Sequence, residues 1–191
     1  MFLLRQPSPE AIRRFISSPR ELPFSYPEVG ATASELPSDY IVDHNRIKLG
    51  TGKEIYDRAV AALQNWKQFD LGWVRMVPPE TPKVGAVVAI LTRHFGFWSL
   101  NACRVVYLID EEGPVTKFGF AYGTLSSHVE RGEERFTIEW HSADDTVWYD
   151  ILAFSRPNQL LVQLGLPLAR MLQKRFARDS LNAMAEAVRH S

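Results

Sequence analysis

The chain has 191 residues, of which 46% are hydrophobic and 12% aromatic, enough for one core of ordinary domain size. Lysine and arginine together number 22, and aspartate and glutamate together also number 22, so the formal net charge is zero. This balance excludes a generally basic nucleic-acid-binding protein, an acidic disordered tail and a low-complexity chain. The single cysteine, Cys103, excludes an internal disulfide and a cysteine-rich metal site.

The first 39 residues predict a short helix followed by an irregular segment. Ser8, Pro9 and Glu10 are typical of a helix start: a hydroxyl cap, a proline in the first turn and an acid near the positive end of the helix dipole. The proline-rich stretch that follows carries apolar side chains that favour burial, namely Leu22, Phe24, Tyr26 and Val29. We therefore expect residues 1–39 to pack as a helix and an irregular wrap on a helix-grip domain at residues 40–191, giving a single domain overall.

The middle of the chain predicts one helix and seven strands. The helix follows Gly50, where Thr51 and Glu54 have the spacing of a capping box. The strand candidates alternate apolar and polar residues, as half-buried antiparallel strands do, and turn residues separate them. They cover Tyr40–Leu49, Leu71–Val77, Gly85–His94, Ala102–Asp110, Thr116–Leu125, Arg135–His141 and Thr146–Phe154.

The last segment, from Pro157 to about Arg189, keeps an apolar stripe at helical spacing and predicts a long helix. Pro167 must kink or restart this helix, because proline removes a helix hydrogen bond. A run of antiparallel strands followed by one long amphipathic helix is satisfied when the sheet curls around the helix. This order predicts an α+β helix-grip (START/Bet v 1-like) fold, with a curved antiparallel sheet of about seven strands around a long C-terminal helix.

A set of short segments occurs in order along nearly the whole chain: Tyr26–Thr32, Leu49–Gly52, Asn101–Tyr107, Phe118–Leu125, His128 with Glu130, Gly132–Phe136, Phe154–Pro157 and Pro167–Arg170. Taken together, these segments resemble the DUF1990 family, a domain of unknown function. The resemblance implies a fold similar to the Bet v 1-like superfamily. It implies no known reaction, because none is assigned to that family.

The strand around residues 118–123 is the most informative for a binding site. Its aromatic side chains share one face, and Gly119, Ala121 and Gly123 share the other. Glycine weakens a strand unless something approaches the backbone closely. The strand either lines a ligand site or packs in the core, with the long helix pressed against the small residues.

His128 and Glu130 are the candidates for acid–base chemistry. An imidazole beside carboxylates can exchange protons or bind a divalent metal. The segment also contains Arg131 and Gly132, which are typical of a turn between strands, so a solvated turn with local ion pairs is the alternative. We predict no metal site and no cofactor.

Arg104 is a candidate for an internal charge. By alternation it shares a strand face with Ala102, Val106 and Leu108. An unpaired charge among apolar residues is costly, so Arg104 is expected either to pair with Glu130 or Glu134 or to bind an acidic group of a ligand.

The other ligand-binding candidates are aromatic or polar residues of the same predicted sheet. Trp98 and Asn101 lie at a predicted strand break, where they could form a gate or a packed aromatic corner. Phe120 would contribute an apolar wall. Tyr107, Tyr122 and His128 would orient the ligand.

Charge is uneven although it sums to zero, with acids concentrated in residues 108–150 and bases in residues 156–191. The basic face of the last helix could contact an anionic membrane or nucleic acid through Arg170, Lys174, Arg175 and Arg178. The alternative is that it complements the acidic hairpins or is solvated. We expect no sequence-specific nucleic-acid partner, no transmembrane segment and a cytoplasmic location.

Three functional hypotheses follow. The first is a protein that binds a small apolar or amphipathic molecule between sheet and helix, because such spaces are default ligand sites. The second is a cofactor-independent enzyme of the cyclase or hydratase type in the same cavity. The third is an interaction scaffold with a filled core, whose basic helix binds a partner.

Overall fold

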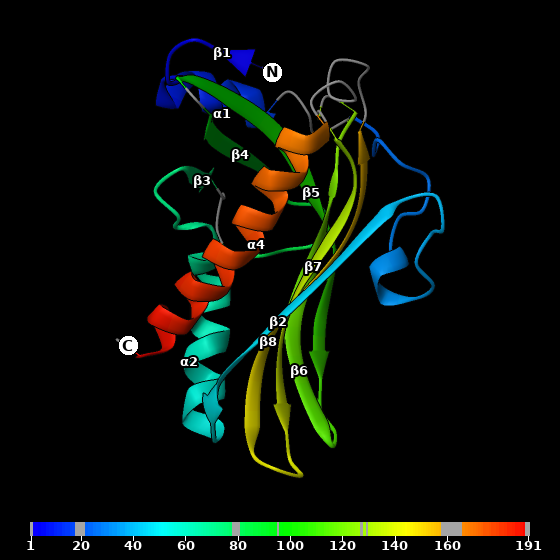
Figure 1. Cartoon of the computed structure of the whole chain (residues 1–191), viewed down its shortest axis with the longest axis vertical. Helices are drawn as coiled ribbons and strands as arrows, with labels where there is room; N and C mark the ends of the chain where they lie inside the picture. The colour runs from blue at the N-terminus through cyan, green and yellow to red at the C-terminus, as the bar shows by residue number, and fades with distance from the viewer. Residues whose placement is uncertain are drawn as a thin grey trace.

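The computed structural model describes residues 2–17, 22–77, 81–94, 96–126, 128, 130–157 and 166–189. An antiparallel sheet curls around a long C-terminal helix (Figure 1). The strands are β1 (Phe2–Leu3), β2 (Ile41–Thr51), β3 (Val74–Val77), β4 (Val87–His94), β5 (Phe97–Glu111), β6 (Val115–Thr124), β7 (Glu130–His141) and β8 (Thr146–Pro157). The helices are α1 (Pro9–Ser17), α2 (Lys53–Gln64) and α4 (Leu166–Arg189), with short 3-10 turns η2 (Ala31–Ala33) and η3 (Lys67–Phe69).

The order of the strands confirms the predicted helix-grip fold. Seven strands follow one another in the order β2-β8-β7-β6-β5-β4-β3, and β1 pairs with β5 off this path. Every described pairing is antiparallel. The strands from β3 to β8 lie side by side in chain order, and β2 pairs with β8 at the other edge. The helix α4 contacts α2, η3, β2 and β8, as expected for a helix held by a curled sheet.

An irregularity in β5 changes which of its side chains share a face. The register of β5 on β6 shifts between Val105 and Tyr107, which is the signature of a β-bulge. Arg104 pairs with Gly123 and Tyr107 with Ala121, so both stand over the small-residue face of β6. The simple alternation that placed Arg104 with Val106 and Leu108 is therefore wrong beyond the bulge.

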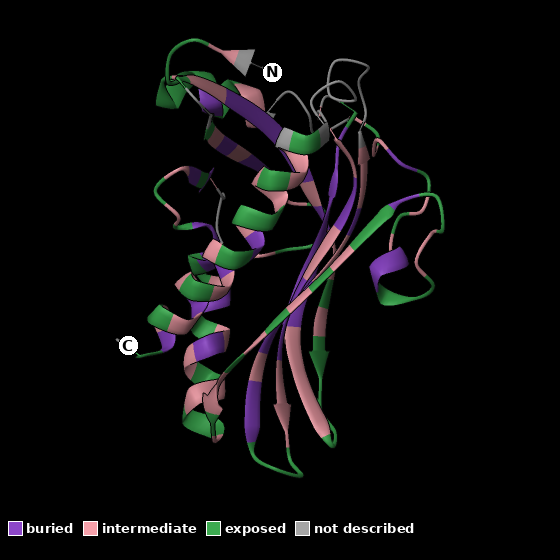
Figure 2. Cartoon of the chain, in the orientation of Figure 1, coloured by how far each residue is buried: buried purple, intermediate pink, exposed green. Residues whose placement is uncertain are grey.

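Different parts of the chain pack against the two faces of the sheet. On the concave face, α2 and α4 lie against the sheet (Figure 2). Together with η3 they pack on the aromatic side chains of β6 and β7. Phe120 and Phe136 are fully buried there, and burial of such a side chain contributes about 1.5–3 kcal/mol. On the convex face, residues 22–40 cover the small residues. The expectation that the long helix presses on the small residues is wrong, because Tyr26 lies there instead: a Cβ at Gly123 would stand 2.0 Å from its hydroxyl oxygen.

Glu133 on β7 binds the residues that cover the convex face. It is 3% exposed, and its carboxylate accepts hydrogen bonds from the Tyr26 hydroxyl (2.6 Å) and the Gly30 backbone N–H (2.7 Å). It also accepts from the Thr32 backbone N–H (3.0 Å) and the Thr32 hydroxyl (2.5 Å). A buried carboxylate needs such donors, so this residue ties the irregular segment to the sheet.

Some local expectations hold and others are corrected. Ser8 caps α1, since its hydroxyl accepts from the Ala11 N–H at 3.2 Å. Thr51 does not cap α2: it is the last residue of β2, and Gly52 occupies the cap position without a side-chain bond. Pro157 ends β8 rather than starting a helix; residues 158–165 lie outside the described chain, and Pro167 stands in the first turn of α4.

Removing the Glu133 carboxylate tests this anchor. In Glu133→Ala the donors of Tyr26, Gly30 and Thr32 lose their acceptor, so the free energy of unfolding should fall by about 3 kcal/mol. Urea unfolding followed by tryptophan fluorescence measures this change. Glu112→Ala, in the exposed turn between β5 and β6, is the control and should change little. Equal losses in the two variants would contradict the anchoring role.

Candidate functional site

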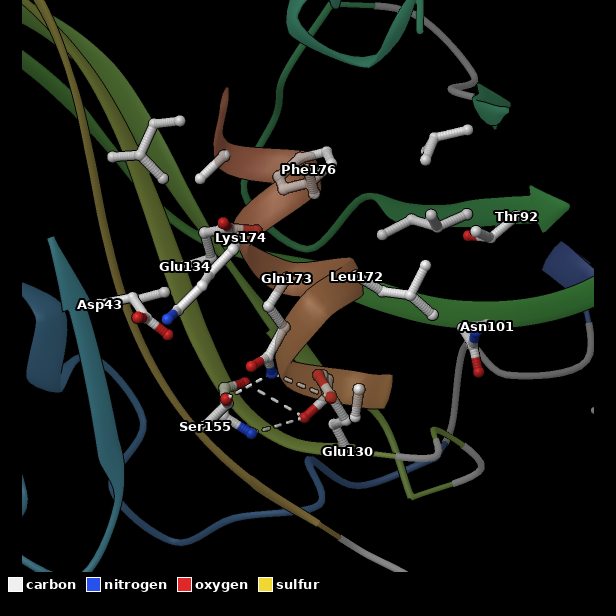
Figure 3. A pocket seen from close by; sticks show the side chains of 18 of the residues that line it. Asp43, Thr92, Asn101, Glu130, Glu134, Ser155, Leu172, Gln173, Lys174 and Phe176 are labelled. Atoms are coloured by element: carbon white, nitrogen blue, oxygen red, sulfur yellow. Dashed lines mark hydrogen bonds between the residues drawn. The ribbon is translucent and has the colours of Figure 1, made fainter. Parts of the chain in front are cut away.

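A cavity of about 700 Å³ lies between the concave face of the sheet and α4 (Figure 3). Its lining comes from all the strands from β2 to β8, from η3 and from α4. Aromatic and aliphatic side chains supply the apolar part: Phe69, Trp73, Ile90, Phe97, Ile151, Leu172, Phe176 and Leu181. The volume falls within the range of small-molecule sites, about 300–1,000 Å³.

The two halves of α4 explain why the space is at one end of the grip. Toward the C-terminus, Met184 and Val188 are buried in the main core, and the Ser180 hydroxyl bonds to that of Tyr149 at 3.0 Å. Toward the N-terminus, the helix presents Leu172 and Gln173 to the cavity. The helix therefore packs against the core at one end and roofs a space at the other.

Two carboxylic acids on β7, Glu130 and Glu134, form what we call the acidic pole of the cavity. The Tyr122 hydroxyl donates to Glu134 Oε2 at 2.6 Å, and Gln173 Nε2 donates to Glu130 Oε1 at 2.9 Å (Figure 3 labels both acids and Gln173). Burial raises the pKa of Glu134 to about 7, and the nearby charge of Glu130 adds to the rise. Burial also raises the pKa of Glu130. The pole thus holds a carboxyl group that exchanges its proton near neutral pH.

An ion pair beside the acidic pole connects α4 to the edge strand β2. Arg170 donates to both oxygens of Asp43, with Nη2 to Oδ1 at 2.8 Å, and also to Gln173 Oε1 at 2.7 Å. The pKa of Arg170 is raised, chiefly by its hydrogen bond to Asp43. Gln173 in turn donates to Ser155 Oγ at 3.0 Å. Arg170 is therefore ion-paired with Asp43. Glu134 has no ion-pair partner among the described residues.

His128 lies in the lining next to the acidic pole. Its Nδ1 accepts a hydrogen bond from the Glu130 backbone N–H at 3.0 Å, which places the proton of the neutral ring on Nε2. Burial lowers the pKa of His128 to about 4. The imidazole is therefore neutral at physiological pH.

The other end of the cavity carries uncharged polar groups, Thr92, Ser99 and Asn101, which we call the neutral pole. Asn101 is 6% exposed, and its Nδ2 donates to Ser99 Oγ at 3.4 Å. Its Oδ1 has no hydrogen-bond partner in the described chain. A buried amide oxygen without a hydrogen bond is rare, so a ligand with a donor group at this position would satisfy Asn101 Oδ1. In Figure 3 Asn101 lies across the cavity from Glu130 and Glu134.

The structure brings together four of the residues singled out from sequence. Asn101, Tyr122, His128 and Glu130 all line the cavity. The segment from His128 to Glu134 is not the solvated turn that was the alternative, because β7 already begins at Glu130.

The other four candidates lie outside the described lining. Trp98 packs in a small cluster with α1, and Phe120 is buried against Trp66 and Phe136. On the convex side, Arg104 donates to the Leu22 carbonyl at 2.9 Å and stacks over Phe24. Also on that side, the Tyr107 hydroxyl bonds to that of Thr32 at 2.6 Å.

Sequence reasoning missed Glu134 and Gln173 as site residues. A signal existed for Glu134, because Glu130, Gly132 and Glu134 share one face of a strand by alternation. The glycine and the surrounding charges favoured a turn instead. For Gln173 no signal existed, since its role depends on where α4 crosses the sheet.

The cations of α4 are largely engaged within the protein. Arg170 pairs with Asp43, while Arg175 and Arg178 both contact Asp179. Arg175 also stacks over Trp73, with 4.3 Å from its Cζ to the ring centroid. Lys174 and Arg178 are exposed and also line the cavity. No group of three or more His, Cys, Asp or Glu side chains within the described ranges is arranged to hold a metal ion.

The sequence matches the family described as Domain of unknown function (DUF1990) over residues 25–183. The chain belongs to this family. A UPF0548 protein of Dictyostelium discoideum is 44% identical, with 98% of this chain and 96% of the relative covered. A UPF0548 protein of Deinococcus radiodurans is 37% identical, with 98% of each chain covered.

Among solved structures, this chain is similar to the ZhuI aromatase/cyclase of Streptomyces sp. R1128. Its TM-score is 0.55, at 9% identity, with 78% of this chain and 94% of that chain covered. This likeness shows that the DUF1990 chain has a Bet v 1-like fold. None of the helices in the described part of the chain has the length and apolar character needed to cross a membrane.

The buried Glu134 predicts a dependence of stability on pH. Its folded-state pKa of about 7 lies above the ordinary value of 4.5, so the folded protein holds this proton more tightly than the unfolded chain. The resulting stabilisation is complete below pH 4.5 and is lost as the pH rises through about 7. Relative to Glu134→Gln, the wild type should lose about 3 kcal/mol of unfolding free energy between pH 4.5 and pH 8.

Urea unfolding at several pH values measures this difference. His128 titrates in both proteins, so its contribution cancels when the variant is compared with the wild type. Glu139→Gln is the matched control, because Glu139 lies on the same strand but pairs with Arg46. Its profile should parallel that of the wild type. Parallel profiles for Glu134→Gln and the wild type would contradict the shifted titration.

Proposed function

We propose that this DUF1990 protein binds a small amphipathic molecule in the cavity between the sheet and α4. The observation that carries the proposal is the combination of an apolar space of about 700 Å³ with buried ionisable groups at one end. Apolar walls supply affinity, and a few polar groups fix orientation. The filled core of the scaffold hypothesis is inconsistent with this cavity.

The lining explains how an amphipathic ligand would be held. Phe69, Trp73 and Phe176 offer aromatic surface for the apolar body of the ligand. Glu134 and Asn101 offer hydrogen-bonding groups at opposite ends, so the ligand would be oriented along the cavity. Contacts made by buried polar groups are stronger than those in water, because no solvent competes there.

A substitution that fills the cavity tests the proposal. Ala153 lies in the lining on β8, so Ala153→Phe should occupy part of the space and weaken binding of the neutral fluorescent probe N-phenyl-1-naphthylamine by about tenfold. Fluorescence titration measures the affinity, and native mass spectrometry of gently purified wild type should show a bound small molecule.

Leu152→Phe is the matched control for this experiment. Leu152 precedes Ala153 on β8 and pairs with Arg135, on the opposite face of the sheet. It should bind the probe like the wild type. If the wild type binds no probe and carries no small molecule, or if both variants bind equally, the proposal is wrong.

The second candidate function is an enzyme that transfers protons in the same cavity. A carboxyl group with a pKa of about 7, hydrogen-bonded to Tyr122, favours it, because general acid–base catalysis works best with a pKa near the operating pH. Glu134 suits this role better than His128, whose pKa is about 4. The aromatase/cyclase named above shares the fold, which is compatible with such chemistry but does not assign it.

Proton-transfer activity would depend on Glu134. Incubation of the protein with a small-molecule extract, followed by liquid chromatography and mass spectrometry, should reveal a compound whose conversion falls at least about a hundredfold in Glu134→Gln. Glu139→Gln should retain full conversion. No conversion by the wild type, or full conversion by Glu134→Gln, would exclude this candidate.

A further inference from the structure

Several oxygen atoms of the cavity lining have no hydrogen-bond donor among the described residues. Tyr122 uses only one oxygen of Glu134, and no described residue donates to Oε1. Gln173 likewise uses only one oxygen of Glu130. At the neutral pole, Asn101 Oδ1 is buried and receives no hydrogen bond from any residue that the structure describes. A molecule that satisfies these oxygens must therefore bring hydrogen-bond donors.

The carboxylate of Glu134 has no ion-pair partner among the described residues. Arg170 donates to both oxygens of Asp43, although its charge also lowers the pKa of Glu130. Lys174 and Arg178 are exposed residues of the cavity lining, and neither forms an ion pair with Glu134. Burial of an ionised carboxylate without a counterion is costly, and a cation that enters the site removes this cost. The aromatic lining favours the same partner, because a cation is attracted to ring faces.

We infer that the ligand is an amphipathic amine, bound as an ammonium ion at Glu130 and Glu134 with its apolar body extending toward Asn101. This inference rests on the proposed function and names its ligand class. The ammonium supplies a positive charge beside Glu134 and a hydrogen-bond donor for its Oε1, for which no described residue provides either. A donor group on the far end of the body, such as a hydroxyl, would satisfy Asn101 Oδ1.

Several ionisable groups surround this position and define its electrostatics. They are Asp43 from β2, Tyr122 from β6, His128 before β7, Glu130, Arg131 and Glu133 from β7, and Arg170, Lys174 and Arg178 from α4. Of these, Asp43 and Glu130 raise the pKa of Glu134 by their negative charge. A bound cation opposes both, so it lowers the pKa of Glu134.

Three probes of equal length separate charge from apolar burial. They are 4-phenylbutylamine, 4-phenylbutan-1-ol and 4-phenylbutanoate, and their affinities for the full chain are measured by isothermal titration calorimetry at pH 8. This pH lies above the pKa of Glu134, which is about 7, so the carboxyl group is ionised while the amine is still protonated. The amine should bind at least about tenfold more tightly than the alcohol, and the carboxylate should bind most weakly.

Glu134→Gln assigns the preference to the acidic pole. The glutamine keeps an oxygen for the Tyr122 hydroxyl but carries no charge, so amine affinity should fall at least about tenfold while alcohol affinity stays within about twofold. Glu139→Gln, the control on the opposite face, should leave all three affinities unchanged.

The outcomes distinguish this inference from the proposed function. Equal binding of amine and alcohol by the wild type would overturn the inference and leave amphipathic binding intact. An amine preference that survives in Glu134→Gln would overturn it as well. If none of the three probes binds, both proposals are wrong. The comparison of the three probes on the wild type is valid even if the Glu134→Gln variant does not fold.

Discussion

The alternation of side chains along β7 is the constraint on which the rest of the structure depends. Glu133 and Glu134 are neighbours in the chain, yet they stand on opposite faces of the sheet. Glu133 binds Tyr26, Gly30 and Thr32 and so holds the irregular segment on the convex face. Glu134 enters the cavity on the concave face. A slip of one residue in the register would exchange the two carboxylates and lose both arrangements.

The same strand shows why two buried carboxylates have different roles. Four donors from the chain surround Glu133, which is the usual way to satisfy a buried anion. Within the described part of the chain, Glu134 receives a hydrogen bond from Tyr122 alone, and burial raises its pKa. The chain therefore supplies several hydrogen-bond donors to Glu133, which holds the fold. It supplies fewer to Glu134, which faces the cavity. Perturbed groups of this kind concentrate at functional sites.

The fold was predictable because its signals are local and repeated. Two-residue periods marked the strands, and a final apolar stripe at helical spacing marked the helix, which together require a curled sheet. The site was only partly predictable. Tyr122, His128, Glu130 and Asn101 line the cavity, but the bulge after Val105 moved Tyr107 to the convex face beside Arg104. No composition signal marks such a bulge, since it is decided by the pairing of β5 with β6.

The sequence by itself determined the order of the elements, the curl of the sheet around the last helix and the presence of a mixed aromatic and polar strand at its centre. Only the tertiary structure decided which face of that strand meets the helix and which meets Tyr26. It also decided that Gln173 donates a hydrogen bond to Glu130 and that Arg170 forms an ion pair with Asp43. The physical reason is that periodicity reports which residues share a face, whereas burial, pairing and pKa depend on what another part of the chain places against that face.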